Sequence, residues 1–196
     1  DYANAYNNLG SALTEDKRHG EAIIHYQRAI KLRPNEVETH HNLAVTLNKQ
    51  GKFQDALVIC EKAIEMGKDY AEVYNTKGAT LNALDQYSEA IKNLNIAIEL
   101  KPDFTEAHNN LGNAQYELGR KKDAVFNYTK AIELNTNYAE AYNNLGVAQF
   151  ELGYERKAIL NYNKAIELKN DYDAAYENLA NALTDYKVKG FSTLLV

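Results

Sequence analysis

Hydrophobic and small residues recur along this chain as pairs of stripes with helical spacing. Within residues 139–172, a first stripe is formed by Tyr142, Leu145 and Gly146. A second stripe follows and is formed by Ala158, Tyr162 and Ala165. At about 100° per residue each set lies on one side of a helix, and small residues let two helices approach closely while tyrosine fills the space beside them. The pattern predicts a helical hairpin.

The hairpin pattern is repeated with a period of 34 residues. The hexapeptide AYNNLG begins at Ala5 and again at Ala141, four periods later. A hairpin of this size cannot bury its apolar faces alone, so each is expected to stack on the next. We therefore expect one array over residues 1–186, followed by a tail or truncated helix at 187–196. Its repeats are 3–36, 37–70, 71–104, 105–138 and 139–172, with the first helix of a sixth at 173–186.

This pattern resembles the tetratricopeptide repeat (TPR) family, whose repeats have the same length. Each repeat shares an aromatic or histidine residue, a Gly or Ala, and a later Ala pair, represented in the first repeat by Tyr6, Gly10, Ala22 and Ala29. The resemblance implies an all-α fold, a right-handed superhelical solenoid in which the first helices line a concave groove. It also implies a non-catalytic module for protein interaction, or the substrate-recruiting TPR region of a larger enzyme such as an O-GlcNAc-type glycosyltransferase. A third interpretation is a scaffold that forms homo-oligomers through its repeat ends.

Helix starts are also periodic in the sequence. Residues of N-cap type recur one repeat apart at Asn35, Asp69, Asp103, Asn137 and Asp171. Three positions after the first four stand Glu38, Glu72, Glu106 and Glu140. This spacing favours a capping box over an acidic binding stripe.

An asparagine ladder is expected along the groove. Counting the first residue of each repeat as position 1, position 6 holds Asn8, Asn42, Thr76, Asn110, Asn144 and Asn178. Position 5 adds Asn7, Asn75, Asn109 and Asn143. Carboxamides offer donors and acceptors that can hold the backbone of an extended peptide. The array is similar to that lining the TPR region of O-GlcNAc transferase; the alternative is a solvated surface without a ligand.

Position 12 presents two adjacent aromatic residues, Tyr116 and Phe150. They could form an apolar pocket for a ligand side chain. They could equally turn inward, because the preceding residues are Gln115 and Gln149 rather than aromatics. Both alternatives stay open at the level of sequence. Groove positions carry Asn and Glu where chaperone co-factors of this family carry a Lys/Arg clamp, so a strongly acidic C-terminal tail is a disfavoured ligand.

Composition limits the other function classes. The formal charge of −5 argues against nucleic acid, and no stretch approaches the roughly 20 apolar residues of a membrane span. No catalytic motif or metal-ligand spacing occurs, so we expect no enzyme activity and no cofactor. His40 and His108 take the place of a packing aromatic residue. Cys60 stands alone, which excludes an internal disulfide framework and permits a reducing compartment. The first residue, Asp1 rather than Met, suggests a fragment or mature form, so the localisation stays open, with the cytoplasm slightly favoured.

Overall fold

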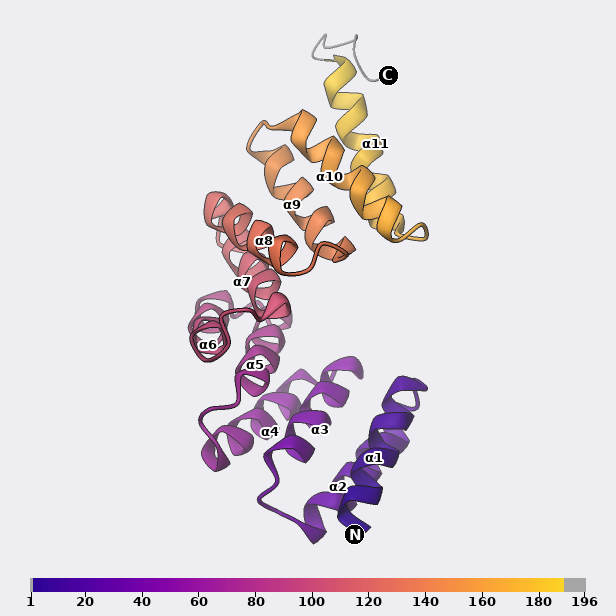
Figure 1. Ribbon diagram of the computed structural model, residues 1–196, viewed down its shortest axis with the longest axis vertical. Helices are drawn as coiled ribbons and strands as arrows, with labels where there is room; N and C mark the ends of the chain where they lie inside the picture. The colour runs from indigo at the N-terminus through magenta and orange to yellow at the C-terminus, as the bar shows by residue number, and fades with distance from the viewer. Residues whose placement is uncertain (1, 189–196) are drawn as a thin grey trace. The chain divides into compact units, whose positions relative to one another are not determined.

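The computed structural model describes residues 2–188, with side chains described through residue 186 (Figure 1). These residues form eleven helices joined by short turns, and no strand. The helices are α1 (Tyr2–Glu15), α2 (His19–Leu32), α3 (Val37–Lys49), α4 (Phe53–Met66), α5 (Ala71–Ala83), α6 (Tyr87–Leu100), α7 (Thr105–Glu117), α8 (Lys121–Leu134), α9 (Ala139–Glu151), α10 (Glu155–Leu168) and α11 (Asp173–Val188). The predicted all-α helical solenoid is confirmed.

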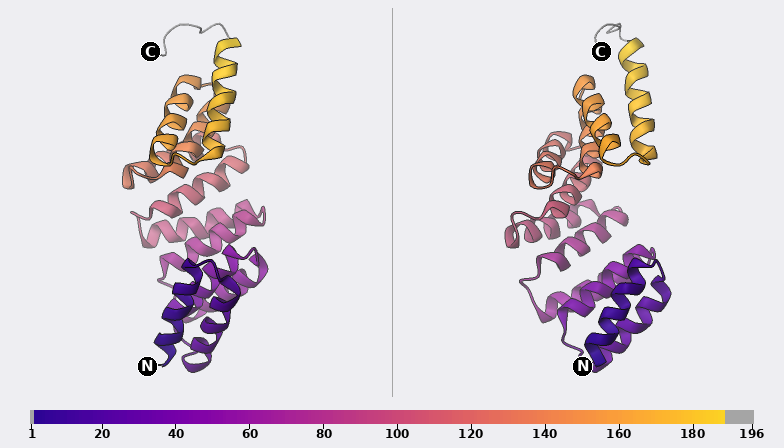
Figure 2. Two further views of the ribbon diagram at one scale, coloured as in Figure 1. Left: turned by 90° about the vertical axis from the view of Figure 1, so that its right-hand side faces the viewer. Right: turned by 45° about the vertical axis from the view of Figure 1, so that its right-hand side comes forward.

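The chain divides into two compact units, Asp1–Pro102 and Asp103–Val196. Helices α1 to α6 belong to the first unit, and α7 to α11 to the second. Within each unit consecutive hairpins stack on one another (Figure 2). The described part of the chain contains no helix with the length and apolar character needed to cross a bilayer.

Close packing inside four of the hairpins depends on a glycine facing a large side chain, whereas the second hairpin has Ala44 at the equivalent position. A Cβ added at Gly10 would lie 2.7 Å from the Tyr26 ring, and one at Gly146 would lie 2.5 Å from the Tyr162 ring. These distances are shorter than van der Waals contact, so only glycine allows the helices to approach this closely.

The turns that join the two helices of a hairpin contain a residue in the left-handed backbone conformation. The turn residue has positive φ at Lys17, Gly51, Asp85, Gly119 and Gly153.

Stacking between hairpins is carried by the first helix of one repeat and the second helix of the repeat before it. In the first unit, Leu43 and Leu47 of α3 join a core cluster with Ala22 and Tyr26 of α2. In the second unit, Leu145 and Ala148 of α9 cluster with Ala124 and Tyr128 of α8. Hairpins within a unit therefore complete their cores through their neighbours.

The predicted capping boxes are wrong. Helices α3, α5, α7 and α9 each begin two residues after the expected cap, which places the four glutamates at the second helical position instead of the third. The actual caps form no side-chain capping bond and are Glu36, Tyr70, Phe104 and Tyr138. Packing explains the shift where the cap is Phe104, which is buried. At Asn137 the backbone N–H bonds instead to Asn135 Oδ1 at 3.0 Å, a turn that precedes the helix.

Candidate peptide-binding face

The first helices of each unit lie next to one another, and each contacts the next first helix of its unit. On any one of them, repeat positions 2, 6, 9 and 13 fall within about 60° of arc. We call these positions the first-helix face. In the second unit they comprise Glu106, Asn110, Asn113 and Glu117 of α7, Glu140, Asn144, Val147 and Glu151 of α9, and Ala174, Asn178, Asn181 and Asp185 of α11.

Amides at positions 5 and 6 bond to each other across consecutive repeats. Asn42 Nδ2 donates to Asn7 Oδ1 at 3.2 Å in the first unit. In the second unit Asn144 Nδ2 donates to Asn109 Oδ1 at 3.3 Å, and Asn178 Nδ2 donates to Asn143 Oδ1 at 3.0 Å. Each bond joins residues 35 apart. The ladder is thus, first of all, a set of hydrogen bonds that hold successive first helices together.

The equivalent pair in repeats two and three uses different side chains. His41 Nε2 lies 3.0 Å from Thr76 Oγ1, in the place taken elsewhere by two amides. Burial lowers the pKa of His41, while the nearby Glu72 carboxylate raises it by a smaller amount. Thr76 is only 6% exposed. Its hydroxyl therefore serves the contact between repeats, and the break that it makes in the asparagine file is filled by His41.

Burial separates the predicted ligand contacts into two groups. Asn109 and Asn143, both at position 5, are 0% and 6% exposed, so with Thr76 they lie out of reach of a ligand. Asn109 also donates to Glu140 Oε1 at 3.1 Å. Asn8 is exposed, and the half-buried members are Asn7, Asn42, Asn75, Asn110, Asn144 and Asn178. Only this second group can meet a partner at the surface.

Tyr116 and Phe150 pack into two different hydrophobic clusters. Tyr116 lies against the cluster that holds Tyr128 and Leu145, whereas Phe150 lies against the one that holds Ile159 and Tyr162. This arrangement favours the packing alternative over a shared ligand pocket. Burial, followed by the hydrogen bond to Glu151, raises the pKa of Tyr116.

A small polar cluster joins α7, α8 and α9 at the edge of the face. Glu151 accepts a hydrogen bond from Tyr116 Oη at 2.5 Å and pairs with Lys121 Nζ at 2.7 Å. Lys121, and then Tyr116, lower the pKa of the Glu151 carboxyl. Glu151 therefore stays ionised to a lower pH than a carboxyl without these neighbours.

Buried and half-buried amides pair inside the hairpins, at positions where the sequence showed only that aromatic residues are missing. Asn127 Nδ2 donates to Gln115 Oε1 at 2.8 Å, and His108 Nδ1 lies 3.1 Å from Asn127 Oδ1. One repeat later, Asn161 Nδ2 donates to Gln149 Oε1 at 2.7 Å. The Gln and Asn stand 12 residues apart in both repeats, and this spacing was the signal available in the sequence. His108 is therefore a packing residue, as expected.

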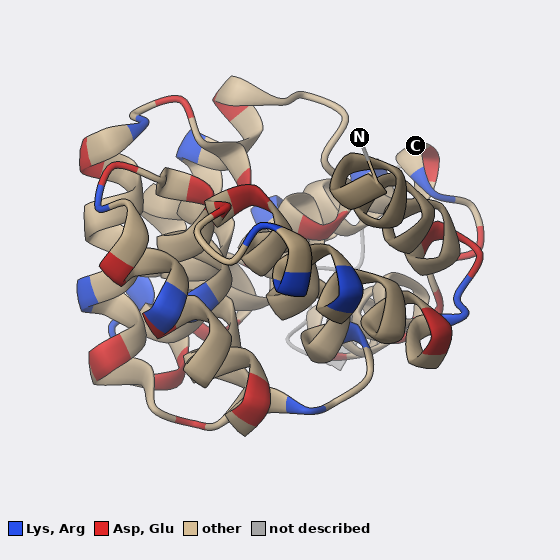
Figure 3. Ribbon diagram, turned by 90° about the horizontal axis from the view of Figure 1, so that it is seen from below, with Lys and Arg blue, Asp and Glu red and all other residues tan. Residues whose placement is uncertain are grey.

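Carboxylates border the amides of the second unit, and only two of them, Glu106 and Glu140, were predicted from the sequence, as capping residues. Glu106 and Glu140 stand at the helix starts, while Glu117 and Glu151 stand at the helix ends. All four are exposed. No Lys or Arg occupies a face position in this unit, although acidic and basic positions are interspersed over the ribbon as a whole (Figure 3). The first-helix face of the second unit is therefore acidic.

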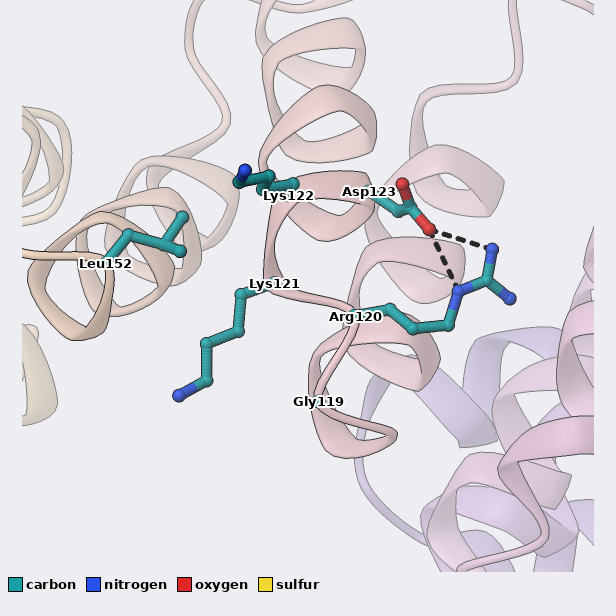
Figure 4. Close-up of a pocket in the computed structure, with 6 residues that line it drawn as sticks. All are labelled: Gly119, Arg120, Lys121, Lys122, Asp123 and Leu152. Carbon is teal, nitrogen blue, oxygen red and sulfur yellow. Dashed lines mark hydrogen bonds and ion pairs between the residues drawn. The ribbon is translucent and has the colours of Figure 1, made fainter.

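A separate pocket of about 300 Å³ lies beside the turn between α7 and α8 (Figure 4). Its cations are already engaged in part, since Arg120 Nη2 pairs with Asp123 at 2.8 Å and Lys121 pairs with Glu151. Leu152 forms the opposite wall. Among residues 2–188, no group of three or more His, Cys, Asp or Glu side chains is placed to hold a metal ion.

Family profiles recognise the repeats directly. Profiles described as TPR repeat or tetratricopeptide repeat match residues 3–36, 25–58, 78–119, 116–153 and 139–172. Together these segments cover well over half of the chain. The chain belongs to the tetratricopeptide repeat family. Repeats of this family are modules for protein interaction, which is the level of function that the match establishes.

Solved structures share the fold at low sequence identity. TTC0263, a thermophilic TPR protein of Thermus thermophilus, is 22% identical over 93% of this chain and 99% of its own, with a TM-score of 0.80. MamA is 27% identical over 83% of this chain and 95% of its own, with a TM-score of 0.69. YrrB, described as a TPR protein with an unusual peptide-binding site, is 23% identical over 88% and 89%, with a TM-score of 0.66. No curated protein sequence matches the chain.

Proposed function

We propose that this TPR chain is a non-catalytic interaction module whose first-helix face binds an extended, positively charged segment of a partner protein. The observation that carries the proposal is the row of amides in the second unit bordered by the exposed carboxylates Glu106, Glu117, Glu140 and Glu151. Opposite charges across an interface steer association and select the partner. A basic segment fits this border, and an acidic one is repelled.

The hydrogen-bonding state of the amides supports the same ligand. Asn144 Nδ2 donates to both Asn109 Oδ1 and Asn113 Oδ1, at 3.3 and 3.1 Å. A carboxamide has two N–H donors, so the part of Asn144 that remains for a ligand is its carbonyl oxygen. That oxygen accepts hydrogen bonds from peptide N–H groups or from Lys and Arg side chains. The first-helix face is thus suited to a ligand rich in donors.

A peptide of alternating lysine and serine, labelled with a fluorophore, tests the proposal by anisotropy. Glu106→Gln/Glu117→Gln removes two face charges that form no ion pair within residues 2–186. We expect this variant to weaken binding about tenfold at low salt, since each lost charge contact is worth on the order of 1 kcal/mol. Glu99→Gln, on the exposed side of α6, is the matched control and should leave the affinity unchanged. Equal affinity of wild type and double variant would refute a basic ligand.

The amides are tested separately by Asn110→Ala/Asn144→Ala. This change should weaken peptide binding and, because Asn144 also joins α9 to α7, lower the thermal midpoint slightly. Melting curves recorded in parallel separate the two effects. Unaltered affinity would exclude the asparagines, but not the carboxylates, as contacts of the peptide.

The same face would serve equally if the repeats recruit substrate for a catalytic domain elsewhere in a longer protein. In that case the ligand would be the substrate segment, and the charge preference would be the same. Joining the repeats to a catalytic domain would then raise turnover of basic protein substrates and not of acidic ones.

A second candidate function is assembly through the repeat ends. Leu9 of α1 is 45% exposed, whereas its equivalents Leu43 and Leu145 are 3% and 6% exposed against a preceding second helix. Ala5 and Ala12 are exposed on the same side of α1. Burial of this side by another helix of the same kind would favour end-to-end stacking. Sedimentation of wild type and Leu9→Ser at increasing concentration tests this stacking. The same concentration dependence of the sedimentation coefficient in both proteins would exclude it.

A further inference from the structure

An apolar pocket of about 230 Å³ lies in the first unit, away from the first-helix face. It opens between the second helices α2 and α4, with α3 between them. Its apolar lining is formed by Ile23, Leu43, Leu47, Val58 and Ile59. Val58 is 51% exposed, so the lining is continuous with the surface. A pocket of this size and chemistry accommodates one large apolar side chain.

Asp55 also lines this pocket, one helical turn before Ile59. It is exposed, and among the described residues it forms no ion pair. A side chain that enters the pocket would therefore do so beside an unpaired negative charge. The preferred occupant carries a cation at a matching distance from its apolar group.

The second unit carries a group with these properties on α8. Phe126 is 63% exposed, which is unusual for a phenylalanine. Lys122 lies four residues before it, is exposed, and pairs with no carboxylate in the described chain. Leu160 is the equivalent of Phe126 on α10 and is 65% exposed. Its neighbouring cations are engaged, because Arg156 bonds to Tyr186 and Lys164 pairs with Glu167.

We propose that the pocket between α2 and α4 binds Phe126 of a second copy of this chain. Asp55 precedes Ile59 by four residues, and Lys122 precedes Phe126 by four, a separation of about 6 Å along either helix. With α8 of one copy parallel to α4 of another, Phe126 enters the pocket as Lys122 reaches Asp55. The same spacing on both surfaces satisfies the apolar and the charged contact together.

The contact is heterologous, because pocket and phenylalanine lie on different parts of the chain. Each copy then offers one of each, and association continues from copy to copy unless a ring closes. A single inserted side chain gives weak binding, with a dissociation constant of roughly 0.1 to 1 mM. The surface is separate from the first-helix face, so this inference does not depend on the proposed peptide site.

Sedimentation velocity of the full chain at increasing concentration tests the contact. Wild type should form dimers and longer species, and Phe126→Asp should lose them, with a dissociation constant raised about 30-fold or more. Leu160→Asp is the matched control, with equal exposure on the next second helix, and should associate as wild type does. A wild type that stays monomeric to millimolar concentration, or equal loss in both variants, would overturn the proposal.

A mixing experiment distinguishes this contact from general stickiness. Val58→Lys blocks the pocket and Phe126→Asp removes the inserted side chain, so each variant alone should be monomeric. Their mixture retains one intact pocket and one intact phenylalanine, and it should form dimers but nothing longer. Reversing both charges, Asp55→Lys/Lys122→Glu, should restore the association that either change alone removes. Failure of both the mixture and the double reversal would exclude the assigned pairing.

Discussion

The ring of Tyr128 lies directly against Gly112. A Cβ atom built at residue 112 would come within 2.6 Å of Tyr128 Cε1 and 2.7 Å of Cδ1. The ring itself is 2% exposed and surrounded by core, so it cannot move aside freely. The spacing between α7 and α8 is therefore set by the absence of a side chain at residue 112.

Gly112→Ala should destabilise the fold, because the added methyl group forces the two helices apart. The expected loss is about 1–3 kcal/mol in the free energy of unfolding, measured by urea denaturation. Gly20→Ala is the control, since a Cβ there meets only Gln50 Nε2 at 3.9 Å. That change should stabilise α2 by about 0.5–1 kcal/mol. Destabilisation of similar size in both variants would contradict the packing explanation.

Asn109→Ala should cost more stability than an exposed asparagine does. The Asn109 amide is fully buried and bonds to Asn144 and Glu140 of the next repeat. Its removal breaks both of these hydrogen bonds between repeats, which costs about 1–3 kcal/mol. Asn163→Ala, at an exposed site on α10, should change the unfolding free energy by less than about 0.5 kcal/mol. Equal effects would mean that the bonds between repeats contribute little.

Glu151 should contribute to the acid sensitivity of the second unit. Lys121 and Tyr116 lower the pKa of its carboxyl in the folded state. A carboxyl whose pKa is lowered by folding stabilises the folded state at pH values above its unfolded pKa of about 4.3. This stabilisation is lost as the pH falls through the folded pKa. Lys121→Gln should therefore lose less stability than wild type on acidification to about pH 3. Lys122→Gln, its unpaired neighbour, should keep the wild-type pH dependence.

Cys60 should be inert in the folded protein. Its side chain is 0% exposed, and burial raises the pKa of the thiol to about 12. Since the thiolate is the reactive form, alkylation by iodoacetamide at about pH 8 should follow unfolding of the first unit rather than occur in the native state. Ser88→Cys adds an exposed thiol on α6 and should react at once. Rapid native labelling of Cys60 would show that α4 opens readily.

Local pattern was sufficient to predict the hairpins. The distance of 16 residues between Gly112 and Tyr128, or between Gly146 and Tyr162, recurs with the period of the repeat. Helical periodicity places each of these residues on the side that meets the other helix, because both helices of a hairpin are adjacent in the chain. The helix starts were less accurate, since Phe104 at the cap is buried by packing that lies outside the local sequence.

The roles of the asparagines could not be predicted in the same way. Asn109 and Asn110 are neighbours of the same type, yet the first is fully buried and the second is half-buried. The difference arises because one residue of helix rotates a side chain by about 100°, and only one of the two directions meets the next first helix. Identity and period are the same for both residues, so the location of the neighbouring helix decides which amide is buried.

Sequence by itself determined the repeat, its all-helical hairpin and the small residues that set the spacing within it, because these depend on contacts between segments close together in the chain. Tertiary structure alone decided which polar groups of successive repeats find each other, as in the Asn144–Asn109 and Tyr116–Glu151 pairs, both 35 residues apart. It also decided which carboxylates remain at the surface. Such pairings depend on how one hairpin is oriented on the next, and a periodic sequence places equivalent residues on every hairpin without specifying which of them will meet.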